Sequence, residues 1–229
     1  MYSVGDNMAN EMEYVISFYH VAMCKDIYFK AYITTYNETF NSDWTPESVY
    51  GRSDPIYIFK QTQRVVTLGF EVLAESKGEA YENLGKVGAL TQFLYPVYQN
   101  TPQAQTISQS PLVRLKMMNL GRSMVKAQEG EKNQIAPQST PSDIYRNYQS
   151  THSPSNGMLG VINNVTINHN IEGEEGVVLK GVNTILPKRI SVNVSFNVIH
   201  EHTLGWDSQK VFGEGHDTFP YGVHLEEIE

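Results

Sequence analysis

Two histidines near the C-terminal end of the chain are the residues whose types and spacing best suit chemistry. His200 and His202 flank Glu201 at the end of a segment that alternates apolar and polar residues. On a β-strand, residues two apart point to the same face, so both imidazoles could bind one metal ion. A zinc site needs a further ligand from elsewhere, and the helical H-E-x-x-H pattern is absent. The pair therefore has two interpretations: part of the metal centre of a hydrolase, or a hydrogen-bonded pair at a strand end.

Other signatures of catalysis are missing from the sequence. There is no Gly-x-Ser-x-Gly elbow, and the single thiol, Cys24, lies in an apolar, strand-like run that predicts a buried structural role. The run Gly173–Gly176 carries two carboxylates where a phosphate site needs bare amides. No pair of carboxylates is singled out for acid–base chemistry. We therefore expect no catalytic residue, no cofactor and no metal.

The stretch Ser42–Val66 has the composition of a contact segment. Pro55 holds the preceding residue in an extended conformation and fixes its own φ, while Gly51 permits a sharp bend. The side chains of Arg52 and Asp54 then have restricted directions from which to bond the backbone or a neighbouring chain. This rigid, polar corner is typical of a recognition element.

The same segment has a second interpretation, in which it is an ordinary loop. Asn, Ser, Asp, Gly and two prolines punctuate residues 37–55, which predicts an irregular connection. In this interpretation Trp44 and Tyr50 anchor the loop on the protein's own core.

Alternating apolar and polar residues predict several β-strands before and after this connection. We expect one or two strands within Tyr14–Tyr36, one over Ile56–Leu73, one from Pro111, one within Gly157–Gly173 and one within Lys188–His202. Two patterns also predict which residues share a face. Near Pro111, Val113, Leu115 and Met117 are expected to be buried. The cations between them, Arg114 and Lys116, are expected to face solvent. After Gly157, five apolar residues share one parity with Asn163 and His169: Leu159, Val161, Val165, Ile167 and Ile171.

One amphipathic helix is expected between the second and third of these segments. Its apolar residues recur at spacings of three and four, at Ala80, Leu84, Val87, Leu90 and Leu94. Ser76 with Glu79 forms a capping box, and Pro96 ends the helix. Gly85 and Gly88 each cost a helix about 1 kcal/mol against alanine, so they indicate either a close approach of another backbone or tolerated glycine.

Composition limits the classes of protein to consider. The chain has 229 residues, 40% of them hydrophobic, and a formal net charge of −8. An acidic chain has little attraction for phosphate backbones or anionic lipid, and a lone cysteine excludes an intramolecular disulfide framework. With no long apolar run, we expect a chain assembled in a reducing cytoplasm and no membrane partner. We predict a single domain over residues 1–229, with a long polar loop at about 121–156 and an acidic tail at about 212–229.

Together these elements predict a mainly β, α+β fold: an antiparallel β-sandwich or partly open barrel with one flanking helix. In the last strand segment, five apolar residues are expected to share one face: Ile190, Val192, Val194, Phe196 and Val198. The polar residues of the other face, Ser191, Asn193, Ser195 and Asn197, suit either a wet channel, a packed neighbour or ordinary solvent.

Several short motifs, taken in order, resemble those of a family of virion proteins from the baseplate of contractile-tailed phages. The motifs cover about residues 40–207 and are distinctive jointly: Ser42-Asp43-Trp44, Val49-Tyr50-Gly51-Arg52-Ser53-Asp54-Pro55-Ile56, Leu94-Tyr95-Pro96, Pro111-Leu112-Val113-Arg114, Gly157-Met158-Leu159-Gly160, Pro187-Lys188 and His200-Glu201-His202-Thr203-Leu204-Gly205-Trp206. Residues 121–156 match the family pattern poorly.

The resemblance implies a tail-tube fold and a structural role without catalysis. In that family, six copies of such a subunit form a ring that initiates or adapts the inner tail tube at the baseplate hub. The implied partners are copies of itself and the hub and tube proteins, with DNA only in transit through the lumen, and the implied location is the virion tail. The expected subunit contacts are Trp44, Tyr50, Arg52, Asp54, Pro55, His200, His202 and Trp206. The alternative is a β-sandwich module that binds carbohydrate or a host surface through its many tyrosines.

Overall fold

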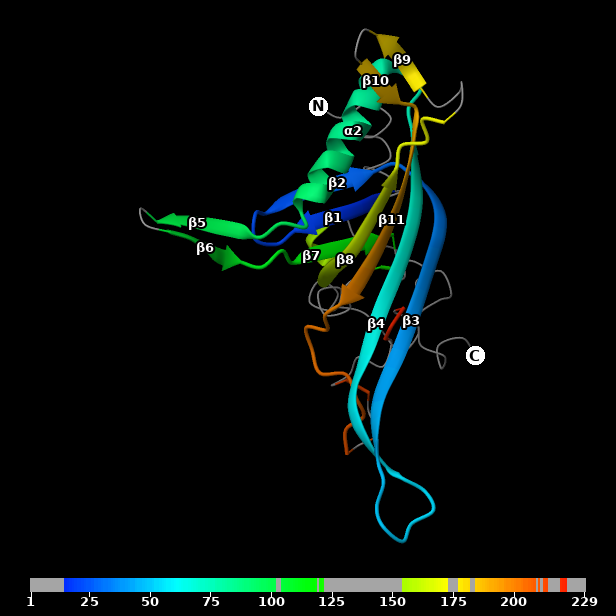
Figure 1. The fold of residues 1–229 in the computed structure, drawn as a ribbon, viewed down its shortest axis with the longest axis vertical. Helices are drawn as coiled ribbons and strands as arrows, with labels where there is room; N and C mark the ends of the chain where they lie inside the picture. Colours follow the sequence, from blue (N-terminus) through cyan, green and yellow to red (C-terminus); the bar gives the residue numbers. More distant parts are fainter. Residues whose placement is uncertain are drawn as a thin grey trace, which may run out of the picture.

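The structure is a computed structural model that describes residues 15–101, 104–118, 120–121, 154–172, 177–181, 184–208, 210, 212–213 and 219–221. Seven of its strands form one antiparallel sheet in the order β2-β1-β7-β8-β11-β4-β3 (Figure 1). Their bounds are β1 (Ile16–His20), β2 (Lys25–Phe29), β3 (Tyr32–Glu47), β4 (Ile56–Leu73), β7 (Val113–Met117), β8 (Met158–Asn168) and β11 (Arg189–Val198). The mainly antiparallel β fold with one helix among the described residues is thus confirmed, and the sheet is open and not a closed barrel.

Two hairpins lie outside this sheet. One pairs β5 (Val97–Thr101) with β6 (Ala104–Gln109), and the other pairs β9 (Val177–Gly181) with β10 (Thr184–Pro187). Figure 1 shows the β5–β6 hairpin projecting to one side of the molecule. A short 3₁₀ turn, η1 (Pro154–Asn156), precedes β8.

The sheet turns a corner within β8. The first residues of this strand, 158–160, pair with β7, and residues 160–168 pair with β11. Gly160 lies where the two pairings meet, and a Cβ atom there would lie 2.1 Å from the backbone oxygen of Asn197. Only glycine fits at such a close approach of two backbones.

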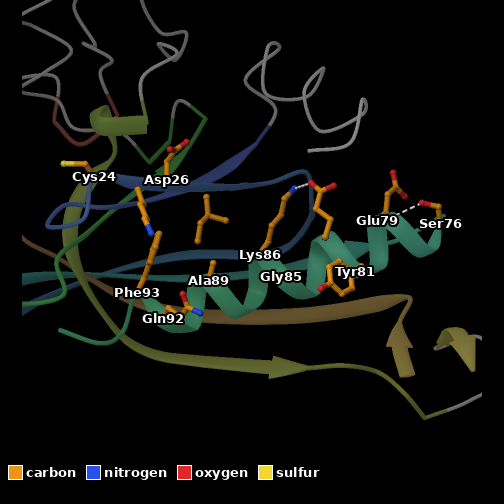
Figure 2. Close-up of a pocket in the computed structure, with 14 residues that line it drawn as sticks. Cys24, Asp26, Ser76, Glu79, Tyr81, Gly85, Lys86, Ala89, Gln92 and Phe93 are labelled. Carbon is orange, nitrogen blue, oxygen red and sulfur yellow. Dashed lines mark hydrogen bonds and ion pairs between the residues drawn. The ribbon is translucent and has the colours of Figure 1, made fainter. Parts of the chain in front are cut away.

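The helix α2 (Lys77–Gln92) begins at the predicted cap. Ser76 accepts a hydrogen bond from the Glu79 N–H at 3.2 Å (Figure 2). The Glu79 carboxylate accepts from the N–H of Glu75 at 2.9 Å, one residue before the N-cap, and not from Ser76 itself. These bonds satisfy amides that a helix N-terminus leaves without partners. The helix ends at Gln92, and its C-cap Phe93 lies three residues before Pro96.

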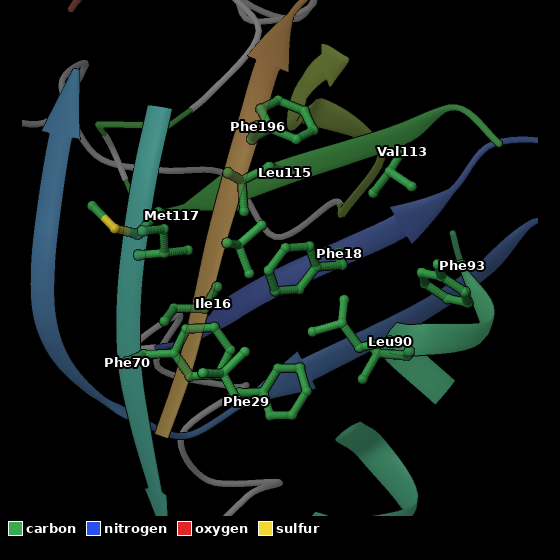
Figure 3. Close-up of a cluster of buried hydrophobic side chains, with 14 of the residues drawn as sticks. Ile16, Phe18, Phe29, Phe70, Leu90, Phe93, Val113, Leu115, Met117 and Phe196 are labelled. Carbon is green, nitrogen blue, oxygen red and sulfur yellow. The ribbon is translucent and has the colours of Figure 1, made fainter. Parts of the chain in front are cut away.

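The hydrophobic core of the described residues lies between α2 and one face of the sheet (Figure 3). Figure 3 shows the rings of Phe18, Phe29 and Phe70 meeting in its centre, with Leu90 and Phe93 contributed by the helix end. The ring centroids of Phe29 and Phe70 are 5.2 Å apart, and those of Phe18 and Phe29 are 6.2 Å apart with an edge-on geometry. The alternation predicted for β11 is confirmed: Ile190, Val192, Val194 and Phe196 are all buried. Each such side chain contributes on the order of 1.5–3 kcal/mol through burial.

The predicted irregular connection over residues 37–55 is wrong for most of its length. β3 continues to Glu47 and pairs with β4 from Tyr32 to Glu47, with two irregularities in the register. Hydrogen bonding to the strongly patterned β4 overrides the poor strand propensity of the Asn, Ser and Asp residues. Only residues 48–55 form the turn.

Three predictions of burial were also wrong. Cys24 is exposed, because it lies in the β1–β2 turn with a positive φ of 49° and not in a buried strand. Arg114 and Lys116 are buried with the rest of β7. Arg114 is accommodated because its guanidinium pairs with Glu201 and donates to the carbonyl of Gly157.

The face predicted for β8 changes part-way along the strand. Met158, Gly160 and Ile162 point toward the core in the first half, and Val165 and Ile167 do so in the second. A bulge opposite Ser195 and Phe196 inserts one residue and reverses the parity. Leu159 and Val161 therefore do not share the face of Val165.

Gly85 and Gly88 have no neighbouring heavy atom within 4 Å of the position that a Cβ atom would take, so no close backbone approach to either is found among the described residues. Most of the predicted loop, residues 122–153, and the end of the predicted tail, residues 222–229, lie outside the described residues. In the described part of the chain, no helix has the length and apolar character needed to cross a membrane.

Candidate interaction surface

Five of the predicted contact residues lie on one projecting hairpin. β11 pairs with β4 only from Val65 onward, so beyond this point β3 and β4 pair only with each other among the described strands. We call residues 40–64 the arm. Figure 1 shows the arm extending away from the rest of the sheet, with its turn at the far end. Trp44 lies on its β3 side, and Tyr50, Arg52, Asp54 and Pro55 lie in or beside the turn.

One face of the arm is aromatic. Trp44 and Phe59 are cross-strand partners whose ring centroids lie 5.1 Å apart, and Tyr57 follows on the same face of β4. The Trp44 indole N–H donates to the hydroxyl of Ser42 at 2.7 Å. All three aromatic side chains are at least half exposed. Cross-strand aromatic pairs of this kind stabilise a two-stranded ribbon, but they leave the outer side of the rings in water.

The opposite face of the arm is also apolar near the turn. Ile56 and Ile58 point to this side and are 41% and 49% exposed. A ribbon of two strands has no third layer with which to cover side chains on both faces. Clustered apolar side chains that stay exposed mark a surface that another molecule covers.

The turn of the arm presents its side chains outward. Gly51 adopts a positive φ of 85°, and the N–H of Arg52 donates to the carbonyl of Val49 at 3.2 Å to close the bend. Tyr50 is fully exposed, and Trp44 is half exposed and outside the core. The interpretation in which these two residues anchor a loop on the core is therefore wrong. Arg52 and Asp54 are exposed as well, and neither is ion-paired with another described residue.

A buried ion pair lies at the root of the arm. The Arg64 guanidinium bonds the Glu38 carboxylate at 2.9 and 3.1 Å, and both side chains are less than a tenth exposed. The Tyr36 hydroxyl donates to the second oxygen of Glu38. Burial, followed by the hydrogen bond to Glu38, raises the pKa of Tyr36 well above its usual value. Both oxygens of the Glu38 carboxylate therefore accept hydrogen bonds, which offsets the cost of burying the charge.

The segment after β11 packs on this root. Arg64 lies between the rings of Phe40 and Phe219, with its central carbon 5.5 and 5.7 Å from their centroids. Phe219 in turn contacts His200, at a centroid distance of 5.7 Å. Burial, and then the nearby positive charge of Arg64, lower the pKa of His200. The imidazole is therefore neutral at pH 7 and acts as part of an aromatic cluster.

The three remaining predicted contact residues are His200, His202 and Trp206. β11 ends at Val198, so His200 and His202 lie beyond the strand and not on it. Glu201 between them instead pairs with Arg114, at 2.8 and 2.5 Å. Nowhere in the described part of the chain do three or more His, Cys, Asp or Glu side chains gather to hold a metal ion. Trp206 is 75% exposed and packs edge-on against Phe212 at 5.2 Å.

The back face of the sheet, opposite the core, is polar and nearly uncharged. Rows of side chains run across β8, β11, β4 and β3 in register: Thr166, Asn193, Gly69 and Thr35 in one row, and Asn164, Ser195, Thr67 and Asn37 in the next. The cation Arg189 on this face is paired with Glu71 at 2.7 Å. Such a face offers hydrogen bonds without a strong field of either sign.

Comparison with known protein families and with curated proteins finds no match for this chain. Sequence reasoning selected the turn of the arm from its Gly and Pro residues, but it missed Tyr57 and Phe59 as exposed aromatics. Their alternation with Ile56 and Ile58 is a signal that was present: four successive apolar residues cannot all be buried by a strand with one covered face. The contact of Phe219 with Arg64 had no local signal, because it joins residues far apart in the chain.

Proposed function

We propose that this protein is a structural virion protein of a contractile phage tail, whose copies close into a ring at the baseplate hub and initiate or adapt the inner tail tube. One observation carries the proposal: the four-stranded part of the sheet, β8-β11-β4-β3, has two open edges. Among the described residues, β7 pairs with β8 only at residues 158–160, and no strand pairs with the outer edge of residues 161–168. None pairs with the outer edge of β3 either.

These two edges are complementary in direction. Each strand of the four is antiparallel to the next, so β8 and β3 run in opposite directions. In a ring, the β3 edge of one copy meets the β8 edge of the next, and the two pair as antiparallel strands. Closure of the ring removes open edges that would otherwise promote aggregation.

The polar back face suits the inside of such a ring. Its Asn, Ser and Thr side chains can be hydrated, and its cation Arg189 is neutralised by Glu71. With a net charge of −8 on each copy, the lumen attracts no phosphate backbone, which favours free passage of DNA. The protein works by contact with its own copies and with hub and tube proteins, and not by turnover.

The test is the assembly state of the purified protein, measured by mass photometry and negative-stain microscopy, alone and with the tube or hub proteins of the same phage. We expect rings with one copy number. A protein that stays monomeric in every mixture, or that binds a glycan array as a monomer, contradicts the proposal.

A matched pair of variants tests the turn of the arm in the same assay. Arg52→Ala removes an exposed cation from the turn, and Lys30→Ala removes one from the β2–β3 connection. We expect Arg52→Ala to raise the concentration needed for assembly about tenfold, the effect of a contact worth about 1.4 kcal/mol, and Lys30→Ala to change it little. Unchanged assembly of Arg52→Ala would remove the turn from the contact.

A further inference from the structure

A groove lies between the free edge of β2 and the helix α2. Its volume is about 950 Å³, at the upper end of the range of about 300–1,000 Å³ that holds a ligand of many atoms. Lys25, Asp26 and Ile27 of β2 all line it. Because successive strand residues point to opposite faces, three in a row indicate that the groove follows the edge of the strand. Among the described strands only β1 pairs with β2, so this edge has backbone groups for a further strand.

The helix wall of the groove includes a glycine, Gly85, which Figure 2 labels between Tyr81 and Ala89. Gly85 lines the groove, and no heavy atom lies within 4 Å of the position its Cβ would take. Glycine at this point destabilises the helix by about 1 kcal/mol relative to alanine, and no group of the described chain packs on it to offset that loss. A backbone that approaches the helix from outside would explain it.

We propose that this groove receives the arm of a second copy of the chain. The aromatic face of the arm exposes Trp44, Tyr57 and Phe59, and this is the face that can lie in the groove while Ile56 and Ile58 point away. At about 100 Å² each, taken as half of a large aromatic side chain, these three offer roughly 300 Å². A stable interface needs about 800 Å² from each partner. The aromatic face of the arm therefore supplies more than a third of one partner's share on a single element.

The groove offers matching chemistry. Its apolar lining comes from Ile27, Ala89 and Phe93, and its carboxylates from Asp26, Glu79 and Glu82. Lys86 is buried and already paired with Glu82 at 3.0 Å, so this lysine is not available to a ligand in the groove. Arg52 in the turn of the arm supplies a cation for the Asp26 and Glu79 carboxylates. The aromatic face of the arm then lies on the apolar lining.

The contact is compatible with a ring and rests on the proposed function, since its occupant is another copy. The β8 edge offers eight residues, 161–168, whereas β3 has 16, so ring closure occupies only the half of β3 next to the sheet. The distal arm stays available. Because arm and groove are different surfaces, the contact is head-to-tail and each copy both gives an arm and receives one.

The native thiol of Cys24 makes the proposal directly testable. Cys24 is exposed, lines the groove and is the only cysteine in the chain. Tyr57→Cys places a second thiol on the aromatic face of the arm. Tyr98→Cys is the matched control, because Tyr98 is a similarly exposed tyrosine on the β5–β6 hairpin. The full chain of each variant is oxidised under assembly conditions and run on a non-reducing gel. A second version of each variant that also carries Cys24→Ser serves as a control.

Docking brings the two thiols to an effective concentration on the order of millimolar, so cross-linking should be at least about tenfold faster for Tyr57→Cys than for the control. The product should be a ladder of three and more copies, because each chain offers one thiol to each neighbour, and Cys24→Ser should abolish it. Rings that form without this cross-link overturn the groove contact and leave the proposed function standing. Absence of any assembly in the parent protein overturns both.

Discussion

Gly160 allows β8 to pass close to β11 at the corner of the sheet, and Gly160→Ala tests that packing. A Cβ atom here would lie 2.1 Å from the backbone oxygen of Asn197 and 2.7 Å from the nearest ring atom of Phe196. Carbon atoms normally approach no closer than about 3.5 Å, so the strands must separate by about an ångström or more. The 2.7 Å hydrogen bond from the N–H of Ile199 to the carbonyl of Leu159 lies in the same contact and lengthens with it.

Overpacking of an interior costs about 1–3 kcal/mol, and one lost hydrogen bond adds about 1 kcal/mol. We therefore expect Gly160→Ala to lower the free energy of unfolding by about 2–4 kcal/mol, and the Tm by about 5–15 °C for a chain of this size. Urea denaturation followed by far-UV circular dichroism measures this. The control is Gly85→Ala, which meets no neighbour within 4 Å in an exposed part of α2 and should gain about 0.5–1 kcal/mol. A Gly160→Ala protein as stable as the parent would refute the packing assigned to the corner.

Three further predictions concern other parts of the molecule. Burial lowers the pKa of His20, so the unfolded chain takes up a proton at a higher pH than the folded chain does. The contribution of His20 to the free energy of unfolding is therefore fully present above about pH 6.5 and is lost as the pH falls below this value. Urea denaturation at several pH values should show a shallower fall for His20→Gln. Arg64→Ala leaves the buried carboxylate of Glu38 without its cation and should cost about 3–5 kcal/mol, whereas Arg64→Met combined with Glu38→Leu should recover most of that loss; a single variant as stable as the parent would contradict the pairing. Trp44→Ser should change the free energy of unfolding by less than about 1 kcal/mol, because the side chain is outside the core, yet impair assembly in mass photometry; a large loss of stability would show that the arm is part of the fold.

The parts of the fold that could be predicted are those in which a local pattern agrees with the tertiary environment. β4 was predicted with the bounds it has, and the buried face of β11 was predicted residue by residue, because both strands have one covered face and one polar face. The cap of α2 at Ser76 followed from hydrogen-bonding capacity within one turn.

The errors arise where a distant partner decides. β3 is a strand because β4 pairs with it, although its own residues predict a loop. Arg114 is buried because Glu201, far along the chain, neutralises it. The reversal of faces in β8 comes from a single bulged residue, which no alternation of apolar residues reveals.

The candidate surface was predicted in part for the right reason. The Gly51 bend in the turn of the arm was expected from residue types alone, and the structure places it at the end of a hairpin. The exposure of both faces of the arm could not be predicted from residue types, because it depends on where β11 stops pairing with β4. The aromatic cluster at the root depends likewise on the chain returning through Phe219.

Hydrogen exchange of the two open sheet edges tests the central claim most directly. If copies close a ring by pairing β3 with β8, the outward amides within residues 32–39 and 161–168 gain backbone partners on assembly. Mass-spectrometric measurement should then show both segments exchanging far more slowly in the assembled protein than in the monomer, with core strand β1 unchanged. An assembly in which both edges exchange at the rate of the monomer would contradict the account.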